Sequence, residues 1–355
     1  MGSEDNEGLL KEGGRVMVTR RQVLSGMIGV TAAAGLRGGL LRPSLAKAQV
    51  LRMKFAHFAD ENHPGHLAAK MFAEAVDKRT NGQIKIDIFP NNMLGSPPEQ
   101  AEQVKMGTTD MGLPTQGQFD KWIKAMGVVM LPFAYDDYDH VHRTLDGPAF
   151  QWFSQMAEKE GFVLLSNWEY GFRNLTNNKR AINAPEDVKG LKVRVPPEMQ
   201  IGAAFEALGA QTTVIAFPEL YMALAQGVAD GEDNPVSVIY FMKFYEVQKH
   251  LALTRHIYNN MIHTISAKTW AKLTPEQKTI FQEESKKAGA FMRQQIVSQE
   301  EDLVAKMQQG GTQVTRPNLA LFRAAMKPAY DKIYKYVGEE NGKKYSEFIE
   351  AARKK

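Results

Sequence analysis

One short stretch decides how the rest of the chain is interpreted: Leu191-Lys192-Val193-Arg194-Val195-Pro196-Pro197. Leu191, Val193 and Val195 alternate as in a strand with one buried face, which places Arg194 on the other face near the strand's carboxyl end. The prolines stop the strand directly afterwards. Ligands of α/β sheets bind beyond the carboxyl ends of strands, and a guanidinium there can hold a carboxylate through two parallel hydrogen bonds. On this pattern alone, a carboxylate-binding Arg194 and a surface arginine on an edge strand are equally supported.

The same alternation of apolar and polar residues predicts strands at residues 51–55 and 84–88. Further strands are expected at residues 162–165 and 211–215. Apolar residues at helical spacing predict helices over residues 67–76 and 97–106, and two more that end at Gly209 and Gly227. Strands alternating with helices indicate an α/β fold in layers.

A long helix is predicted in the last third of the chain. Thr274-Pro275-Glu276-Gln277 is a capping box with proline at the first helical position. No proline follows until Pro317, and the isolated Gly289 does not interrupt the pattern. Roughly 30 helical residues extend about 45 Å, which is longer than one small domain. We therefore expect this helix to run along two interwoven domains.

Composition limits the possible functions. The 355 residues suffice for two domains, and the hydrophobic fraction of 43% with 24% charged residues is that of a soluble globular protein. The absence of cysteine excludes disulfides, thiolate catalysis and cysteine-based metal sites. The first 48 residues carry seven Lys/Arg and four Asp/Glu, so the rest has 37 basic and 36 acidic residues. A net charge of +1 gives no general attraction for nucleic acid.

The first 48 residues are expected to be a Tat-type signal peptide. Thr19-Arg20-Arg21-Gln22-Val23-Leu24 precedes a weakly hydrophobic, glycine- and alanine-rich stretch over residues 25–41, and Ala46-Lys47-Ala48 offers a cleavage site. The alternative is a disordered basic tail. Cleavage would leave a mature chain that begins near Gln49 and has no later segment able to anchor it. Met17 is an alternative start, because the polar residues before it fit an export signal poorly.

Two further polar positions are candidates for ligand contact. Arg173 lies between a predicted strand and a turn-rich segment, and it is either a second carboxylate contact or an interdomain ion pair. Residues 230–235 form a turn-forming cluster. Asn234 precedes a proline, which favours an extended backbone that presents its amide to a ligand; an ordinary polar turn is the alternative.

Histidines and aromatic residues give weaker signals. His63 and His66 are separated by Pro64-Gly65, so capping of the next helix is favoured over a metal pair. Trp168 either stacks on a ligand or belongs to the core. The sequence contains no P-loop, no Gly-x-Ser-x-Gly, no His-Glu-x-x-His and no dinucleotide-binding glycine fingerprint. No cofactor and no metal are expected.

From about residue 53 to residue 345, the chain resembles the substrate-binding proteins of TRAP (tripartite ATP-independent periplasmic) transporters. Segments of the mature chain carry this resemblance in order: Gly82-Gln-Ile-Lys-Ile, Leu94-Gly95, Gly107-Thr-Thr-Asp-Met111, Gly171-Phe-Arg-Asn-Leu-Thr-Asn, Asp187-Val-Lys-Gly-Leu-Lys-Val-Arg-Val-Pro196, Leu208-Gly-Ala-Gln-Thr212, Phe217-Pro-Glu-Leu-Tyr-Met-Ala-Leu-Ala-Gln-Gly-Val-Ala-Asp-Gly-Glu-Asp-Asn-Pro235 and Phe244-Tyr-Glu-Val-Gln-Lys249. Any one of these segments is compatible with chance, whereas all of them in this order point to the family.

The resemblance implies a two-domain, hinged α/β binding protein of the periplasm, with the long helix supporting both halves. Domain I would comprise residues 49–171 and 260–299, and domain II residues 172–259 and 300–355. The family's carboxylate-binding arginine falls on Arg194 and its second arginine on Arg173. Its ring-packing aromatic falls on Phe217 and its cleft asparagine on Asn234.

The resemblance also implies a ligand class and a partner. Glu61, Thr115, Gln116 and Glu169 would line a polar pocket beside the arginines, with Trp168 near it, which suits a sugar acid such as a uronate or aldonate. Sialic-acid-binding members carry a glutamate where Thr115 stands, and this departure argues against that ligand.

The expected function is capture of an organic-acid anion by a monomer and its delivery to a membrane permease. A C4-dicarboxylate or 2-oxo acid is the alternative ligand. A secreted enzyme with Glu61 or His63 as acid/base is the remaining alternative function.

Overall fold

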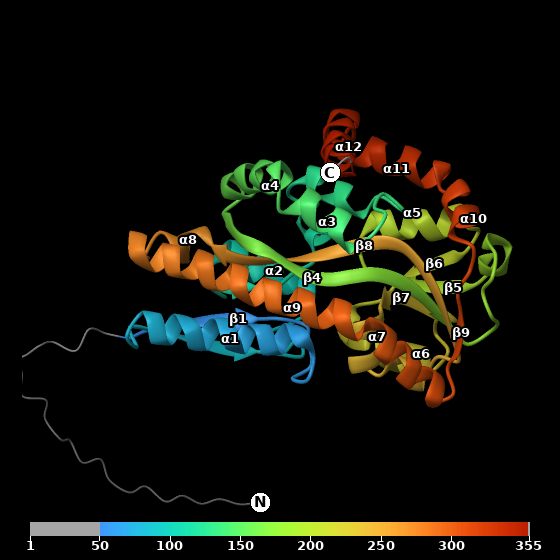
Figure 1. Cartoon of the computed structure of the whole chain (residues 1–355), viewed down its shortest axis with the longest axis horizontal. Coiled ribbons are helices and arrows are strands. Elements are labelled where there is room, and N and C mark those ends of the chain that lie inside the picture. Colours follow the sequence, from blue (N-terminus) through green and yellow to red (C-terminus); the bar gives the residue numbers. More distant parts are fainter. Residues whose placement is uncertain (1–49, 354–355) are drawn as a thin grey trace, which may run out of the picture. The chain divides into compact units, whose positions relative to one another are not determined.

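The computed structural model describes residues 50–353, so the expected signal peptide lies outside the described residues. Within 50–353 the strands join into a nine-stranded sheet of order β2-β1-β3-β8-β4-β7-β5-β6, with β9 beside β8 (Figure 1). The strands are β1 (Leu51–Ala56), β2 (Ile84–Phe89), β3 (Met111–Gly112), β4 (Phe162–Asn177), β5 (Lys192–Val195), β6 (Gln211–Val214), β7 (Gly231–Pro235), β8 (His250–Ser266) and β9 (Gln313–Thr315).

Two long antiparallel strands, β4 and β8, form the middle of the sheet. Parallel strands β1, β2 and β3 continue it on one side, and the parallel strands β5, β6 and β7 continue it on the other. The strand expected at residues 162–165 covers only the first quarter of β4. The rest escaped prediction because β4 is buried at almost every position and carries many polar residues, so that no apolar alternation is visible.

Three register shifts in the β4–β8 pairing change which side of the sheet each residue faces. They lie between Leu164 and Ser166, between Glu169 and Gly171, and between Arg173 and Leu175. Each added residue moves the following side chains to the opposite face. Leu164 and Phe172 therefore belong to one hydrophobic cluster, whereas Leu165 and Trp168 belong to the second.

Helices expected from the sequence are confirmed at α1 (Pro64–Arg79), α2 (Pro97–Met106), α5 (Met199–Ala207) and α6 (Leu220–Ala225). His63 caps α1, since its Nδ1 accepts the backbone N–H of Gly65 at 3.0 Å. Capping was the favoured interpretation of this histidine. Desolvation by burial lowers the pKa of His63 to about 3. The ring therefore stays neutral and can accept the hydrogen bond of the cap.

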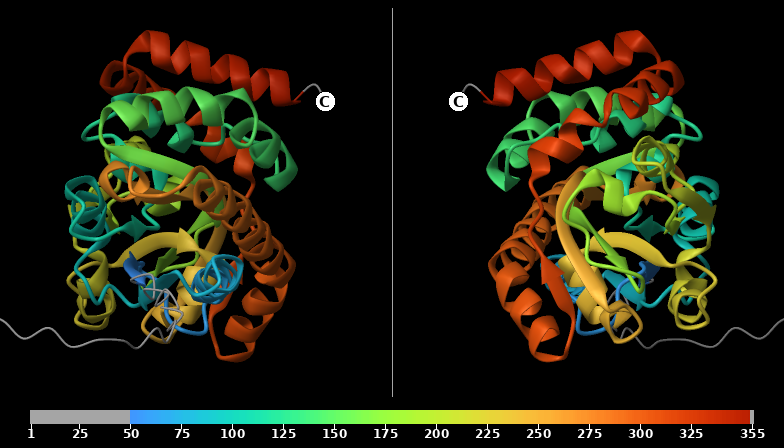
Figure 2. Two further views of the ribbon diagram at one scale, coloured as in Figure 1. Left: turned by 90° about the vertical axis from the view of Figure 1, so that its left-hand side faces the viewer. Right: turned by 90° about the vertical axis from the view of Figure 1, so that its right-hand side faces the viewer.

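Further helices surround the sheet (Figures 1 and 2). They are α3 (Tyr138–Leu145), α4 (Pro148–Lys159), α7 (Val236–Phe241), α8 (Ala267–Trp270), α10 (Leu319–Ala324), α11 (Lys327–Val337) and α12 (Glu339–Arg353). Short 3-10 turns are η1 (Gln116–Phe119), η2 (Lys124–Met130), η3 (Pro185–Val188), η4 (Phe217–Glu219) and η5 (Phe244–Glu246). Helix α12 packs on α3 and α4, and α11 packs on α5, so the C-terminal helices close one of the two hydrophobic clusters.

The predicted long helix is α9 (Pro275–Gln309), with 35 residues and the expected capping box between Thr274 and Gln277. It packs along β4 and α1 and reaches α7, so it contacts elements from both expected domains. Gly289 is required where α9 crosses β4: a Cβ there would lie 2.7 Å from Trp168 Cδ1 and 2.8 Å from the Asn167 carbonyl oxygen.

The sheet passes without interruption through both expected domains, and residues 50–353 form one compact unit. This continuity agrees with domains that are interwoven, whereas the boundaries expected at residues 171, 259 and 299 remain predictions. None of the helices between residues 50 and 353 has both the length and the apolar character required to cross a bilayer.

Candidate ligand-binding site

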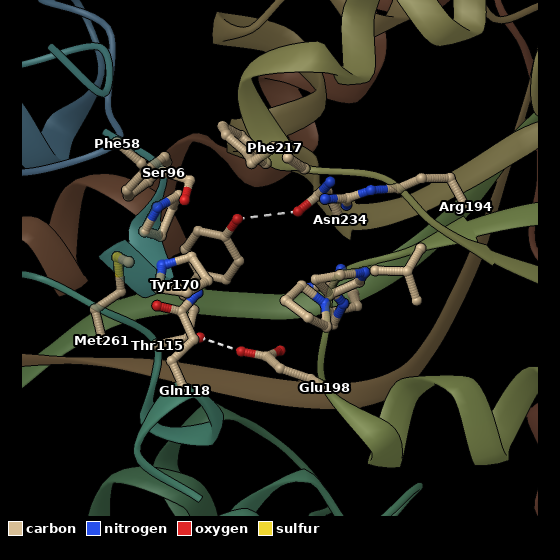
Figure 3. Close-up of a pocket in the computed structure, with 17 residues that line it drawn as sticks. Phe58, Ser96, Thr115, Gln118, Tyr170, Arg194, Glu198, Phe217, Asn234 and Met261 are labelled. Atoms are coloured by element: carbon tan, nitrogen blue, oxygen red, sulfur yellow. Dashed lines mark hydrogen bonds between the residues drawn. The ribbon is translucent and has the colours of Figure 1, made fainter. Parts of the chain in front are cut away.

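A cavity of about 200 Å³ lies where several parallel strands end (Figure 3). Its walls come from β4, β5, β6, β7 and β8 and from segments that follow the carboxyl ends of β1, β2, β3, β5 and β6. This is the expected position for a ligand in an α/β sheet. The lining residues are Phe58, Ser96, Pro97, Pro98, Thr115, Gln118, Tyr170, Arg173, Arg194, Pro196, Pro197, Glu198, Val214, Ala216, Phe217, Asn234 and Met261.

Arg194 is a buried cation in the wall of this cavity, only 1% exposed. Its neighbours Val193 and Val195 lie in the hydrophobic core, as the strand alternation predicted. Its Nε donates to the Ile215 carbonyl oxygen at 2.9 Å, which fixes the side chain, while Nη2 has no hydrogen-bond partner among residues 50–353. Burial lowers the pKa of Arg194 to about 10, with Glu232 opposing the shift, so the group stays protonated at neutral pH.

Phe217 and Arg194 are neighbours in the cavity wall. The guanidinium carbon lies 6.0 Å from the centre of the Phe217 ring, within the range of a cation–π contact. Phe217 follows β6 at the start of η4, and its ring also packs edge-on against Phe58 and Phe244. The aromatic ring therefore gives the arginine a fixed, apolar flank.

Arg173 also lines the cavity, but its position differs from the one expected. It lies inside β4 rather than in a segment between a strand and turns. Nε donates to Asp233 Oδ2 at 2.6 Å and Nη2 donates to Oδ1 at 3.0 Å. This ion pair joins β4 to β7, but both residues fall within expected domain II, so it is not the interdomain pair considered as an alternative.

Residues 231–235, expected to be a turn, form strand β7. The polar composition of Glu232-Asp233-Asn234 suggested exposure, yet all three residues are buried with partners. Burial would raise the pKa of Asp233, but Arg173 and His256 hold it well below its ordinary range; His256 Nε2 lies 3.1 Å from Oδ2. Paired charges can occupy an interior strand that sequence composition assigns to the surface.

Asn234 holds its amide at the cavity through two side-chain hydrogen bonds. Tyr170 donates its hydroxyl to Asn234 Oδ1 at 3.0 Å, and Asn234 Nδ2 donates to Glu232 Oε2. Burial, followed by the charge of Asp233, raises the pKa of Glu232 to about 7. The second Nδ2 hydrogen of Asn234 remains for a further acceptor.

Glu198 is a cavity residue that sequence reasoning missed. It follows Pro196-Pro197 after β5, it is 3% exposed, and its Oε1 accepts a short hydrogen bond from the hydroxyl of Thr115. Burial raises the pKa of Glu198 to about 6, against the lowering effect of Arg173. Its place just beyond the carboxyl end of β5 was the available signal, but its burial was not visible in the sequence.

Four of the expected site residues do not line the cavity. Glu61 is exposed in the turn before α1. Gln116 accepts at Oε1 from Asn260 at 2.8 Å, and Glu169 Oε2 lies 2.7 Å from His142 Nε2, so both turn to other parts of the buried interior. Trp168 lies in the core, where its Nε1 donates to the Ser285 carbonyl oxygen at 3.0 Å.

The remaining expected residues, Arg194, Arg173, Asn234, Phe217 and Thr115, do line the cavity. Figure 3 shows Arg194, Asn234 and Phe217 in the upper part of the view, and Thr115, Gln118 and Glu198 below them. The cavity thus combines buried arginines with hydrogen-bond acceptors and an aromatic wall. Among residues 50–353 there is no group of three or more His, Asp or Glu side chains arranged to hold a metal ion.

Comparison with known proteins gives a consistent picture. The family model of the bacterial extracellular solute-binding proteins, family 7, matches residues 55–336. The chain is 37% identical to the sialic acid-binding periplasmic protein SiaP of Vibrio cholerae over 77% of this chain and 85% of that protein.

Two solved structures are similar over the same part of the chain. A TRAP periplasmic solute-binding protein of Polaromonas bound to D-erythronate has a TM-score of 0.80 and 32% identity, over 83% of this chain and 98% of that one. One of Sulfurospirillum deleyianum with bound succinate has a TM-score of 0.79 and 33% identity, over the same shares. These matches confirm the fold class and the resemblance: the chain belongs to family 7 of the bacterial extracellular solute-binding proteins, the family of the TRAP binding proteins.

Proposed function

We propose that the chain captures an organic-acid anion in this cavity and holds its carboxylate on Arg194. The observation that carries the proposal is Nη2 of Arg194, which is buried in the cavity wall and has no hydrogen-bond partner among residues 50–353. A buried donor without an acceptor is unfavourable by about 1–3 kcal/mol, and more when it is charged. A ligand carboxylate removes this penalty and neutralises the cation.

The two arginines have different parts in this binding. Nε and Nη2 of Arg173 are engaged by Asp233. Arg194 uses only Nε for the protein, which leaves donors of its planar fork for the ligand. Arg173 contributes positive potential to the cavity, whereas Arg194 makes the direct contact. The Phe217 ring excludes water from one side of that contact and so strengthens it.

A sugar acid is the ligand class that the cavity supports best. Besides the arginines, the wall presents the Asn234 amide, the Glu198 carboxylate and the Gln118 amide, which can bind hydroxyl groups along a short polyol chain. The similar structures bind D-erythronate in one case and succinate in the other. A C4-dicarboxylate or a 2-oxo acid is therefore the second candidate.

Thr115 lies where sialic-acid-binding members carry glutamate, and its hydroxyl is bonded to Glu198. This contact supports a ligand other than sialic acid.

Delivery to a membrane permease follows from membership in the family. Ligand binding between the two expected domains closes them about the hinge, and the closed form docks on the permease. The named relatives are periplasmic proteins, and the twin-arginine leader supports export of this chain to the same compartment. We propose that it works there as a monomer, without cofactor or metal.

Catalysis by Glu61 or His63 has little support. Neither residue lines the cavity: Glu61 is exposed in a turn, and His63 is buried with its Nδ1 engaged in capping α1. Incubation of the purified protein with its ligand, followed by mass spectrometry, checks this point. Return of the ligand unaltered supports capture, and a changed mass supports an enzyme.

The ligand class is tested by a thermal-shift screen against aldonates, uronates, C4-dicarboxylates and 2-oxo acids. At a fixed concentration, an acid that binds only the folded protein raises the melting temperature more the more tightly it binds. The largest shift is expected for an aldonate or uronate. Equal, negligible shifts for all four classes would contradict the proposal.

A further inference from the structure

We propose that Glu198, supported by Thr115 and Gln118, is the specificity-determining residue of the cavity: it accepts ligand hydroxyls and excludes a second carboxylate. This inference rests on the proposed function, because it assumes that one carboxylate of the ligand binds Arg194. It names the chemical class more narrowly, as hydroxylated monocarboxylates rather than dicarboxylates.

Glu198 is a buried carboxylate that makes no ion pair with residues 50–353, although the charge of Arg173 acts on it from farther away. The only hydrogen bond of its side chain within that part of the chain is from Thr115. A buried charge without a counterion is retained only where surrounding groups or a ligand stabilise it. The hydroxyls of a polyol chain are such donors.

Gln118 adds an acceptor to the same wall. Its Oε1 is buried and has no hydrogen-bond partner within residues 50–353, although the residue lines the cavity. Figure 3 shows Gln118, Thr115 and Glu198 together on one side of the cavity, away from Arg194. This side of the cavity therefore favours ligand groups that donate hydrogen bonds, whereas the Arg194 side favours a ligand group that accepts them.

A dicarboxylate bound to Arg194 would place its second negative charge near the wall that contains Glu198. Nε and Nη2 of Arg173 are already bonded to Asp233, so among residues 50–353 Arg194 is the lining arginine with a buried donor, Nη2, that has no partner. A second carboxylate would lie near the like-charged Glu198 without a counterion of its own, and like charges at close range disfavour binding strongly. Near neutral pH the repulsion persists, because burial raises the pKa of Glu198 only to about 6.

A purely structural role for Glu198 makes a different prediction. If the residue served only to tie the segment after β5 to Thr115, glutamine would replace it, because its side-chain oxygen accepts the same hydrogen bond. Ligand selectivity would then be unchanged. The ratio of the affinities for two different acids, rather than the affinity for one acid, therefore distinguishes a structural role of Glu198 from a role in selectivity.

D-erythronate and succinate are suitable probes, since both are four-carbon acids. The first has one carboxylate and three hydroxyls, and the second has two carboxylates and none. Isothermal titration calorimetry at pH 7.5 is expected to show D-erythronate bound at least tenfold more tightly by the wild-type chain. In Glu198→Gln the ratio of the two dissociation constants is expected to fall at least tenfold, through tighter succinate binding and weaker erythronate binding.

Matched variants complete the experiment. Glu206→Gln, the same substitution at an exposed position of α5 paired with Lys332, is expected to keep the wild-type ratio. Gln118→Glu adds a carboxylate to the wall and is expected to shift the ratio further against succinate. A ratio within twofold of wild type in both cavity variants would overturn the inference.

Failure of the inference and failure of the proposed function are distinguishable. If Arg194→Lys weakens both acids while Glu198→Gln leaves their ratio unchanged, carboxylate capture stands and the role of Glu198 does not. If the wild-type chain binds neither acid, the inference fails, whereas the proposed function is decided by the thermal-shift screen. If Arg194→Lys binds both acids as wild type does, the proposed function and the inference both fail.

Discussion

Arg173 and Asp233 form a two-armed ion pair inside the sheet, with Nε 2.6 Å from Oδ2 and Nη2 3.0 Å from Oδ1. Both side chains are almost completely buried. The pair joins the central strand β4 to β7 and orients Arg173 along the cavity wall without leaving it free to bind as Arg194 does. One arginine therefore maintains the site, and the other is available to the ligand.

The ion pair predicts a large effect on stability. Asp233→Asn removes one charge and leaves Arg173 buried beside a neutral amide, which is expected to destabilise the chain by about 3–5 kcal/mol. Urea denaturation measures the difference. Asp87→Asn breaks an exposed pair with Arg52 and is the control, with an expected change below about 1 kcal/mol. Equal stability of the two variants would contradict a structural role for Asp233.

Glu198 is expected to make the free energy of unfolding depend on pH. Burial raises its pKa from 4.5 to about 6, so the folded chain binds a proton more tightly than the unfolded chain. Its contribution is therefore most favourable below pH 4.5 and is lost as the pH rises through about 6. Glu198→Gln cannot ionise and is expected to be more stable than wild type by ~2 kcal/mol at pH 8, without ligand.

Below pH 4.5 the difference between Glu198→Gln and wild type is expected to vanish. Comparing the two proteins at each pH removes the contributions of all other titrating groups. The matched variant Glu206→Gln should show no such pH dependence, since Glu206 is exposed. A flat stability difference for Glu198→Gln between pH 4 and pH 8 would contradict an ionised, buried Glu198.

Alanine substitution at two helical glycines, Gly289 and Gly202, is expected to change the stability of the chain in opposite directions. Alanine in a helix normally stabilises by about 0.8–1 kcal/mol relative to glycine. At Gly289 a methyl group would overlap Trp168 and the Asn167 carbonyl, and overpacking of this kind destabilises by about 1–3 kcal/mol. Gly289→Ala is therefore expected to lower the melting temperature.

Gly202 provides the matched control, because it also lies within a helix, α5, and nothing lies within 4 Å of a Cβ built there. Gly202→Ala is expected to raise the melting temperature. If both variants were stabilised, the close packing of α9 on β4 would not hold as described.

The leader predicts an export route. Arg20→Lys combined with Arg21→Lys is expected to block translocation, because Tat signals depend on the arginine pair. Cell fractionation should then find the precursor in the cytoplasm, whereas Arg15→Lys serves as a control that is exported normally. N-terminal sequencing of the exported wild-type chain is expected to begin near Gln49. Unchanged export of the double variant would exclude the Tat route.

Much of the fold follows from local patterns in the sequence. Strands β1, β2 and β5 alternate clearly, and α2 and α9 carry capping boxes and prolines at their first turns. These signals depend on neighbouring residues only, so they can be recognised without the tertiary structure. The position of Arg194 followed from the same reasoning.

The centre of the sheet could not be predicted in this way. The register shifts of β4 depend on its pairing with β8, and they decide that Trp168 faces the core. Strand β7 resembled a turn because its charges are neutralised by partners distant in the sequence, such as Arg173. Glu198 was missed for a related reason: its burial depends on Thr115, 83 residues away.

The role of Arg194 is tested by calorimetric titration of D-erythronate into wild type and Arg194→Lys. Lysine keeps the charge but loses the planar fork. The affinity is expected to fall by roughly 100-fold, equivalent to about 2.7 kcal/mol, with an unchanged circular dichroism spectrum. The exposed Arg52→Lys should bind as wild type does. Equal affinity of Arg194→Lys and wild type would exclude Arg194 as the residue that holds the carboxylate.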